Sequence, residues 1–230
     1  SGEIDGGREH SKLVLRHDGS SVPVTLVGAP IHRGGEITGV VLVLHDMTRE
    51  RQYMARLSWQ ATHDALTGLT NRREFEYRLQ IALERLERNS GRHALMFLDL
   101  DQFKLVNDTC GHAAGDELLR QVCTLLQQGL REGDTLARLG GDEFAVLVGG
   151  SNAEQHARDI AERLLRELAK PVEFAKQWLV ITPSIGVALF PGDALQFGKL
   201  YKAADQALYR VKGAGRAGYA MVQELQLEQA

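Results

Sequence analysis

The fold of this chain is decided by one stretch, Thr135-Leu-Ala-Arg-Leu-Gly-Gly-Asp-Glu-Phe-Ala-Val-Leu-Val148. Apolar and β-branched residues occupy both of its ends, and Gly140-Gly141 lies between them. The pattern predicts a hairpin of two strands, Thr135–Leu139 and Phe144–Val148. An earlier run, Ala94–Leu98, is short and continuously apolar, which is typical of a buried strand.

Helical patterns and one further strand region surround these three strands. They are a helix with Leu118, Val122, Leu125 and Leu126 on one face, a helix opened by Ser151-x-x-Glu154, and a strand region, Trp178–Phe190, interrupted near Pro183. From Ala94 the order is therefore strand–helix–strand–strand–helix–strand, the split βαβ or ferredoxin-like arrangement. Its first and third strands are antiparallel neighbours. We predict an α+β fold in which the end of strand 94–98 lies beside the Gly140-Gly141 turn.

Two more helices flank this core. Asn71 can cap a helix with Glu74 at the capping-box position, and Gly91 ends that helix. The last helix has Leu200, Ala204 and Val211 among the residues of its apolar stripe, and Gly213 can stop it.

Length, composition and charge exclude several classes of protein. The 230 residues, 43% hydrophobic and 25% charged, correspond to about one and a half domains of an ordinary globular chain. The net charge of −3 argues against a dedicated nucleic-acid binder. No apolar run approaches the roughly 18 residues of a membrane span. Two cysteines make neither a disulfide framework nor a zinc set, which favours a cytoplasmic location.

The first 47 residues carry strand patterns of their own. The segments Lys12–His17, Val22–Ile31 and Ile37–His45 are rich in β-branched residues, and Asp18-Gly19 and Gly34-Gly35 supply turns. A polar helical segment, Thr48–Gln60, follows. We interpret it as a connector, although it could also be the first helix of the next domain.

Carboxylates gather where the strand order brings two strand ends together. Asp99 ends the first strand and Asp101 follows it, while Asp142 and Glu143 occupy the Gly-Gly turn. Such a cluster suits Mg²⁺ or Mn²⁺, which prefer oxygen ligands. Alternatively Gly-Gly-Asp-Glu is only a hairpin turn, where Gly and Asp are common.

The loop expected after the first strand, Gln102–Gly115, reaches the same edge. Asn107 within it and Asp116 just after it have side chains that can read a purine edge, although Asp116 also suits the first turn of a helix. Near the C-terminus, Lys212 and Arg216 flank flexible glycines. Two cations there suit a polyphosphate, although a solvated helix end is an alternative.

Six motifs in this order resemble the GGDEF family of diguanylate cyclases over about Asp64 to Ala217. They are Asp64-Ala-Leu-Thr-Gly-Leu-Thr-Asn-Arg-Arg73, Asp99-x-Asp-x-Phe-Lys-x-x-Asn-Asp108, Gly111-His-x-x-Gly-Asp116, Gly140-Gly-Asp-Glu-Phe144, Ser184-Ile-Gly186 and Ala204-Asp-x-Ala-Leu-Tyr209. The resemblance implies a nucleotide-cyclase palm that condenses two GTP into cyclic di-GMP and releases pyrophosphate. It also implies a homodimer, because one such site binds one GTP.

The resemblance also implies roles for individual residues. The metal, Mg²⁺ or Mn²⁺, would be held by Asp99, Asp142 and the Leu100 carbonyl, with Glu143 as a further ligand or base, so that Asp142 and Glu143 are catalytic. The implied guanine-binding residues are Asn107 and Asp116, and those near the phosphates are Phe103, Lys104, Lys212 and Arg216. The family's last motif usually ends Gly-Arg-Asn, whereas here Arg216 is followed by Ala217.

A second site is implied by Arg131-Glu-Gly-Asp134, which matches the family's RxxD motif for inhibition by the product, cyclic di-GMP. Arg163 on the following helix is implied as a further contact. The alternative is an ordinary helix end and strand start, where Arg131 is favoured anyway.

The N-terminal segment resembles the C-terminal strands of a PAS sensor domain, through Arg16-x-Asp-Gly19, Pro30-Ile31 and Gly39-Val-Val-Leu-Val-Leu-His-Asp-Met-Thr48. The expected organisation is a partial PAS domain (1–47), a connector helix (48–61), a GGDEF domain (62–218) and a linker (219–230), with further domains before and after. An alternative function is a GTP-binding regulatory module that controls a fused phosphodiesterase domain. A protein-interaction scaffold is a third reading.

Overall fold

The structure, a computed structural model, describes residues 10–86, 91–174, 177–191 and 196–222. The chain divides into two compact units, residues 1–60 and 61–230. The expected linker, 219–230, lies outside the described residues from residue 223 onward.

The first unit is a three-stranded antiparallel sheet followed by a helix. The strands β1 (His10–Leu15), β2 (Ser21–Arg33) and β3 (Glu36–Asp46) pair in chain order, which confirms the three predicted strands. The helix α1 spans Thr48–Thr62 and has no buried residue.

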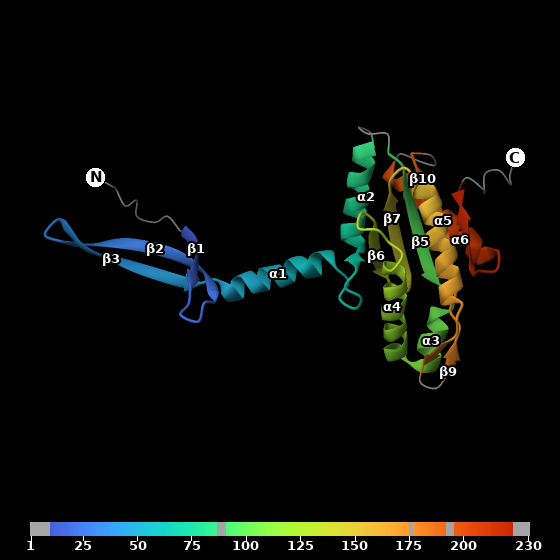
Figure 1. Ribbon diagram of the computed structural model, residues 1–230, viewed down its shortest axis with the longest axis horizontal. Helices are drawn as coiled ribbons and strands as arrows, with labels where there is room; N and C mark the ends of the chain where they lie inside the picture. Colours follow the sequence, from blue (N-terminus) through green and yellow to red (C-terminus); the bar gives the residue numbers. More distant parts are fainter. Residues whose placement is uncertain (1–9, 87–90, 175–176, 192–195, 223–230) are drawn as a thin grey trace. The chain divides into compact units, whose positions relative to one another are not determined.

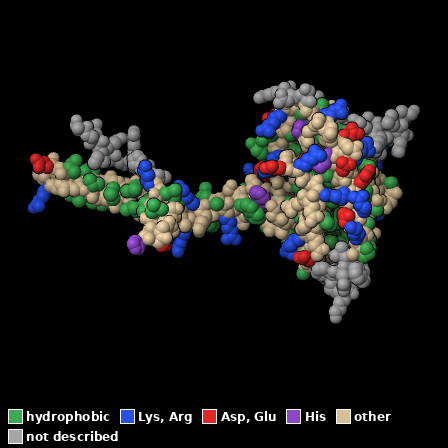
Figure 2. Space-filling model, in the orientation of Figure 1, with side chains coloured by type: hydrophobic (Ala, Val, Ile, Leu, Met, Phe, Trp, Pro, Cys, Tyr) green, Lys and Arg blue, Asp and Glu red, His purple; other side chains and the backbone are tan. Residues whose placement is uncertain are grey.

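Apolar side chains of this sheet are exposed on both faces. Five successive residues of β3, Val40–Leu44, are between 48% and 59% exposed, although their side chains alternate across the sheet. Figure 2 shows hydrophobic side chains along these strands. Three strands bury little apolar surface by themselves, so this sheet has little core of its own.

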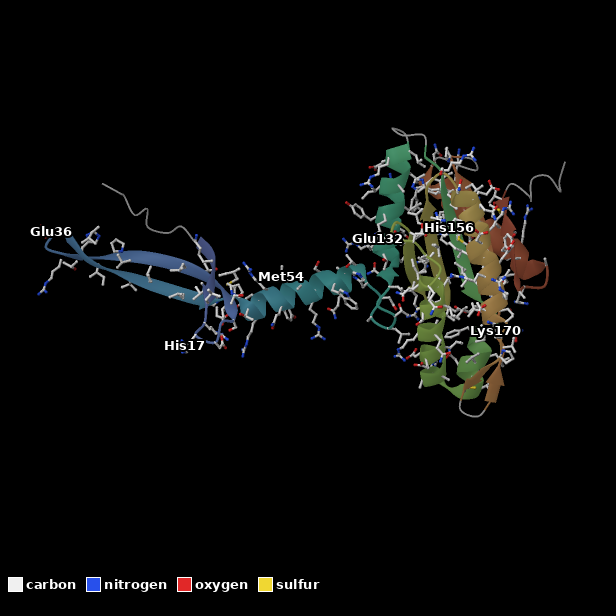
Figure 3. The ribbon with its side chains drawn as sticks, in the orientation of Figure 1. His17, Glu36, Met54, Glu132, His156 and Lys170 are labelled. Atoms are coloured by element: carbon white, nitrogen blue, oxygen red, sulfur yellow. The ribbon has the colours of Figure 1, made fainter. Side chains whose placement is uncertain are left out.

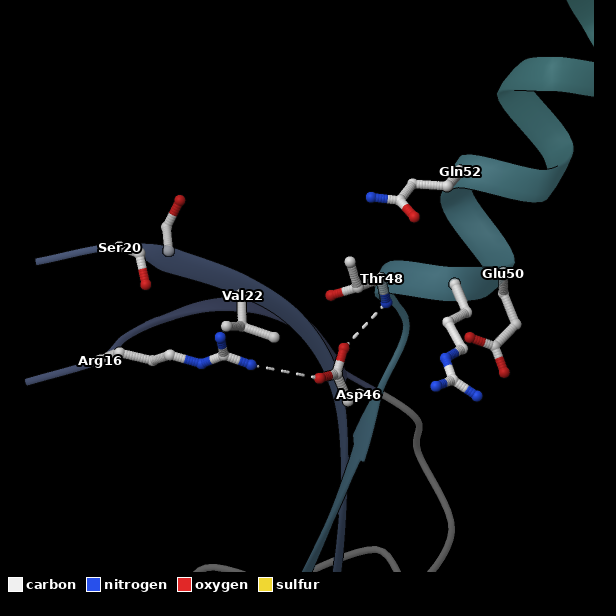
Figure 4. A pocket seen from close by; sticks show the side chains of 9 residues that line it. Arg16, Ser20, Val22, Asp46, Thr48, Glu50 and Gln52 are labelled. Atoms are coloured by element: carbon white, nitrogen blue, oxygen red, sulfur yellow. Dashed lines mark hydrogen bonds and ion pairs between the residues drawn. The ribbon is translucent and has the colours of Figure 1, made fainter. Parts of the chain in front are cut away.

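Asp46 connects the sheet to α1. Its Oδ1 accepts a hydrogen bond of 2.9 Å from the Thr48 N–H, and its Oδ2 lies 3.6 Å from Nη2 of Arg16 (Figure 4). The hydrogen bonding of Thr48 lowers the pKa of the Asp46 carboxyl. A side-chain oxygen at this position satisfies an N–H group at the start of the helix, which explains why α1 begins at Thr48.

The second unit is built on a six-stranded mixed sheet with the order β11-β10-β5-β7-β6-β4. Its four central strands are β5 (His93–Leu100), β6 (Thr135–Gly140), β7 (Glu143–Gly149) and β10 (Pro183–Phe190). β5 is antiparallel to both β7 and β10, and β6 is antiparallel to β7. The predicted split βαβ core is confirmed.

Two short edge strands extend this core. β4 (Thr70–Asn71) pairs parallel to β6, and β11 (Gly218–Met221) pairs parallel to β10. β11 includes residues expected to belong to the C-terminal linker, and the side chain of Met221 is buried. The sheet therefore continues past residue 218.

Helices cover both faces of the sheet (Figure 1). One face packs against α3 (Phe103–Cys110), α4 (His112–Gln127) and α5 (Ala153–Leu168), and the other against α2 (Arg72–Leu86) and α6 (Phe197–Gly213). β5 contributes side chains to both layers. Met96 and Leu98 pack on the face covered by α3, α4 and α5, and Leu95 and Phe97 pack on the face covered by α2 and α6. As predicted, Asn71 caps α2: its Oδ1 accepts the Glu74 N–H at 3.0 Å.

The segment Gln102–Gly115, predicted as a loop, is helical instead. It forms α3 and the first turn of α4, separated at Gly111, whose φ of 84° favours glycine. Phe103 and Val106 of α3 are buried in the core. This burial stabilises the helix, which the local sequence pattern does not indicate. The predicted region Trp178–Phe190 divides into β9 (Gln177–Leu179), which pairs with β8 (Val172–Phe174), and β10.

Within the described residues, no helix is long and apolar enough to cross a membrane. In the described part of the chain, neither Cys110 nor Cys123 forms a disulfide.

Candidate active site

The C-terminal end of β5 lies beside the turn between β6 and β7. Asp99 pairs across the sheet with Glu143, the residue that follows Asp142 in the turn. The turn depends on Gly140 (φ 146°) and Gly141 (φ 53°), in a region of φ that favours glycine. The strand order therefore brings three acidic residues to one edge of the sheet, as the sequence predicts.

Asp99 and Asp142 form a pair of like charges. Burial raises the pKa of Asp142 above its usual value, and the neighbouring Asp99 raises it further. Nζ of Lys212 lies 2.7 Å from Oδ2 of Asp99. Because two carboxylates share one ammonium group, the site keeps an excess of negative charge, which a divalent cation would neutralise.

Glu143 is engaged by an arginine. Its Oε2 lies 3.2 Å from Nη2 of Arg72, whose Nη1 donates to the Tyr201 hydroxyl at 2.8 Å and whose Nε donates to the Leu139 carbonyl at 3.2 Å. Arg72 thus ties the start of α2 to the β6–β7 hairpin and to α6. Among the described residues, no three His, Cys, Asp or Glu side chains are grouped so that they could hold a metal ion.

Asp101, predicted among the carboxylates of this edge, is used differently. Its side chain is buried, and its two oxygens accept hydrogen bonds from the Ser184 hydroxyl, the Thr182 hydroxyl and the Ala217 N–H, at 2.7, 2.7 and 3.0 Å. The carboxylate therefore binds other parts of the chain, and we do not count it among the candidate metal ligands.

Asn107 and Asp116, the expected guanine-binding residues, come from α3 and α4. The side chain of Asn107 lies directly over Gly115: a Cβ at that glycine would be 2.0 Å from the Asn107 Oδ1. Gly115 thus allows the two helices to approach closely. As a result, the Asn107 amide lies next to the residue that precedes Asp116.

Phe103 and Lys104 open α3. The side chain of Phe103 is buried in the core, whereas Lys104 is exposed. The first N–H groups of a helix have no partner within it, so a phosphate near this end would meet backbone N–H groups and the Lys104 ammonium group.

Arg216 lies in a tight turn after α6. Gly215, Arg216 and Ala217 all have positive φ, of 116°, 69° and 50°. The Arg216 side chain is 53% exposed, and its Nε is 4.0 Å from Oδ1 of Asp101. Its guanidinium group is therefore anchored near a buried carboxylate and still open to a ligand.

The RxxD residues lie at the start of β6, away from the Gly-Gly turn. The Asp134 side chain is only 3% exposed, because its Oδ2 accepts the Arg131 N–H and faces Nε2 of His156, both at 2.9 Å. Figure 3 labels Glu132 in this turn and His156 on α5. Arg131 itself is exposed.

Arg163 approaches the same segment from α5. A Cβ at Gly129 would be 1.4 Å from its Nη2, so the guanidinium group occupies the space that this glycine leaves. That Nη2 atom is buried, and none of the described residues forms a hydrogen bond with it. The two arginines thus border the same α4–β6 connection.

Sequence reasoning gave no role to Arg72, Arg138 or His156. Arg138 forms an ion pair with Asp64 (Nη1 to Oδ1, 3.0 Å) and donates from Nε and Nη2 to the Gly141 carbonyl at 2.9 and 2.8 Å. It therefore fixes the Gly-Gly turn. A signal was available for two of these residues: Arg138 precedes Gly140 by two positions, and His156 is a polar residue on the apolar face of α5.

Replacing Asp64 by asparagine is expected to lower the free energy of unfolding by about 2 kcal/mol at pH 7, because Arg138, mostly buried, would lose its charged partner. Burial raises the pKa of Asp64, but hydrogen bonds from Thr67 and the Arg138 ion pair outweigh it, so the net pKa is below the usual 3.8. The carboxylate thus stabilises the fold above about pH 4, and this contribution is lost as pH falls through the lowered pKa.

Denaturant unfolding at pH 7 and at pH 3 would measure the free energies of unfolding of wild type and Asp64→Asn. The difference between the two proteins should be smaller at pH 3 than at pH 7. The control is Asp159→Asn, which alters an exposed carboxylate of α5. Equal stability of wild type and Asp64→Asn at pH 7 would contradict the assignment.

The family described as diguanylate cyclase, GGDEF domain, matches residues 61–218. Among curated relatives, the probable diguanylate cyclase DgcE of Escherichia coli K12 is 44% identical over 184 residues, which are 79% of this chain and 16% of the relative. Diguanylate cyclase TpbB of Pseudomonas aeruginosa is 40% identical over 163 residues, 70% of this chain and 38% of the relative. The chain thus spans well under half of the length of these relatives.

Solved structures agree. The GGDEF domain of TpbB from Pseudomonas aeruginosa matches with a TM-score of 0.67 and 36% identity, covering 73% of this chain and 99% of that domain. The coiled coil and GGDEF domain of DgcB from Caulobacter crescentus, in complex with cyclic di-GMP, matches with a TM-score of 0.68 and 30% identity, covering 75% and 92%. Family match, relatives and fold all lead to one conclusion: this chain belongs to the GGDEF family of diguanylate cyclase domains.

Proposed function

We propose that this chain condenses two GTP molecules into cyclic di-GMP and releases pyrophosphate. The observation that carries the proposal is the Asp99–Asp142 pair at the sheet edge, with Lys212 beside it and Arg216 on the turn that follows the same helix. Named relatives such as TpbB are diguanylate cyclases, which supports the same reaction here.

The donor set fits Mg²⁺ or Mn²⁺. Asp99, Asp142 and the Leu100 carbonyl would supply oxygen ligands, which these ions prefer. The raised pKa of Asp142 reflects burial and repulsion from Asp99, and a cation between them would relieve that repulsion. When bound, the ion would neutralise triphosphate charge and increase the acidity of the attacking 3′-hydroxyl. For Glu143 to act as a ligand or base, its ion pair with Arg72 must open.

The remaining residues would bind and orient GTP. The Asn107 amide and the Asp116 carboxylate would hydrogen-bond the guanine edge. Lys104, Lys212 and Arg216 would bind the phosphates, together with backbone N–H groups at Phe103 and the start of α3. Holding the α-phosphate in line with an incoming hydroxyl converts a collision between two nucleotides into a reaction of bound groups.

Each site can hold one GTP, so product formation requires two copies of the chain that face each other. The exposed residues Tyr53 and Leu57 of α1, with Gln60, offer a helical stripe for such a homodimer. We further propose that β1–β3 are the C-terminal strands of a PAS sensor domain. We also propose a cytoplasmic location, where GTP is available and cysteines outside disulfides are expected.

We propose that cyclic di-GMP also inhibits the enzyme by binding at Arg131, Asp134 and Arg163. The support is an exposed Arg131, a buried Nη2 of Arg163 without a partner, and a turn fixed by Asp134. The DgcB structure was obtained in complex with cyclic di-GMP.

A second candidate is a GTP-binding module that regulates a phosphodiesterase domain. It is favoured by a relative that is named for phosphodiesterase activity alone, the cyclic di-GMP phosphodiesterase NbdA of Pseudomonas aeruginosa. NbdA is 40% identical over 162 residues, which are 70% of this chain and 21% of NbdA.

Incubation of the chain with GTP and Mg²⁺ would distinguish these functions. A diguanylate cyclase would yield cyclic di-GMP and pyrophosphate, with a rate per molecule that rises with protein concentration. Bound GTP without product would support the regulatory module. Neither binding nor product would contradict both, and would leave only the scaffold reading.

A further inference from the structure

We propose that Asp101 is a positioning residue for GTP binding: its buried carboxylate holds the turn of residues 215–217 and thereby places the Arg216 guanidinium group. This inference rests on the proposed function, in which Arg216 binds phosphate.

The Asp101 carboxylate joins three separate parts of the chain. It follows the end of β5, and its side chain is 4% exposed. Its oxygens accept hydrogen bonds from the hydroxyls of Thr182, just before β10, and Ser184, within β10. The Ala217 N–H donates to the same Oδ2 that Thr182 contacts, at 3.0 Å. The backbone contributes as well, because the Asp101 N–H donates to the Thr182 carbonyl at 2.8 Å.

The turn needs this support because of its backbone conformation. Arg216 and Ala217 have φ of 69° and 50°, the left-handed region that residues other than Gly, Asn and Asp rarely adopt. The Arg216 N–H donates to the Val211 carbonyl at 3.0 Å, which closes the end of α6. Ala217 stands where the resembling motif usually has asparagine. The alanine side chain cannot form a hydrogen bond that would stabilise this conformation. Residue 217 itself is held through its N–H, which donates to Asp101.

Charge adds to this support. The Arg216 Nε lies 4.0 Å from Oδ1 of Asp101, and more than half of the Arg216 side chain remains exposed. One side of the guanidinium group is therefore directed by a buried carboxylate, while its remaining N–H groups stay available to a ligand. Asp99, two residues earlier, instead contacts Lys212. Asp99 and Asp101 therefore each contact a different basic side chain at the same edge of the sheet.

A double-mutant cycle separates positioning from general stabilisation. The measurement is the dissociation constant of a non-hydrolysable GTP analogue in Mg²⁺, for the full chain carrying Asp101→Asn, Arg216→Ala or both. Each single change is expected to weaken binding by about tenfold. The double variant should bind as weakly as Arg216→Ala alone, because Asp101 acts through Arg216.

A rescue provides the second readout. Ala217→Gly is expected to recover about threefold of the affinity lost in Asp101→Asn, because glycine adopts a positive φ without help. The control is Leu83→Ala in α2, which removes a buried side chain at the other end of that helix from Arg72. It should lower the unfolding midpoint and leave affinity for the analogue unchanged.

Independent losses of affinity in the double variant, or no rescue by Ala217→Gly, would overturn the inference while leaving the proposed function intact. If Asp101→Asn does not fold, Thr182→Val and Ser184→Ala each remove one donor to the carboxylate and enter the same cycle. A wild-type chain that does not bind the analogue would overturn the proposed function and this inference with it.

Discussion

Replacing Asp142 by alanine is expected to lower the formation of cyclic di-GMP by about 1000-fold or more, with the fold intact. The variant removes one of the two carboxylates that would hold the divalent ion, and Lys212 would then neutralise Asp99 alone. The measurement is the initial rate of product and pyrophosphate release at saturating GTP and Mg²⁺. Undiminished turnover would remove Asp142 from the catalytic assignment.

Removing the Asp142 charge should lower activity but should not lower the stability of the fold. Burial and the Asp99 charge raise the pKa of Asp142, so the folded state binds a proton more tightly than the unfolded state does. The ionised carboxylate therefore costs stability at neutral pH, and this cost disappears as pH falls through the raised pKa toward the usual 3.8. Asp142→Asn should accordingly unfold at an equal or higher denaturant concentration than wild type at pH 7 without metal.

The effect of Mg²⁺ supplies the matching control. The ion should stabilise the wild-type chain against unfolding, because a ligand that binds the folded state raises its stability by mass action. It should stabilise Asp142→Asn much less, because this variant lacks one of the proposed carboxylate ligands. A variant stabilised as strongly as wild type would show that Asp142 is not a ligand, even if its activity is low.

The core of the fold could be predicted because local sequence patterns mark its central strands. Apolar runs and the Gly140-Gly141 turn mark β5, β6 and β7 directly, and their order specifies one sheet topology. β4 and β11 could not be predicted, because strands of two and four residues carry too little pattern and obtain their pairing from β6 and β10. α3 was missed because burial of Phe103 and Val106 stabilises it, rather than helix propensity.

In the candidate site, too, some features follow from local patterns and others depend on contacts between distant residues. Strand topology alone brings Asp99 and Asp142 together. The pairing of Arg138 with Asp64 joins residues 74 positions apart and depends on side-chain direction, which no local pattern specifies. Asp101 shows the limit of alternation: β5 ends at Leu100, so the rule that places residues i and i+2 on one face no longer applies.

Replacing Arg131 by alanine is expected to weaken binding of cyclic di-GMP by about 100-fold, and to leave the initial rate of its synthesis unchanged. In the described part of the chain, no hydrogen bond or ion pair engages the Arg131 guanidinium group, which leaves it available to a ligand phosphate or base. Titration of cyclic di-GMP against both proteins by calorimetry would measure the change. Equal affinities would contradict the assignment.

Arg131 is a sharper test than Asp134, because Asp134→Ala would leave the buried His156 without its partner and alter the turn itself. Glu132→Gln, an exposed neighbour, is the matched control and should bind normally. β6 has six residues, so at about 3.3 Å per residue this site lies roughly 20 Å from the Gly-Gly turn. A ligand at that distance would not overlap GTP, so the proposed inhibition would act by restraining how two copies meet. Arg131→Ala should therefore abolish inhibition without changing the KM for GTP.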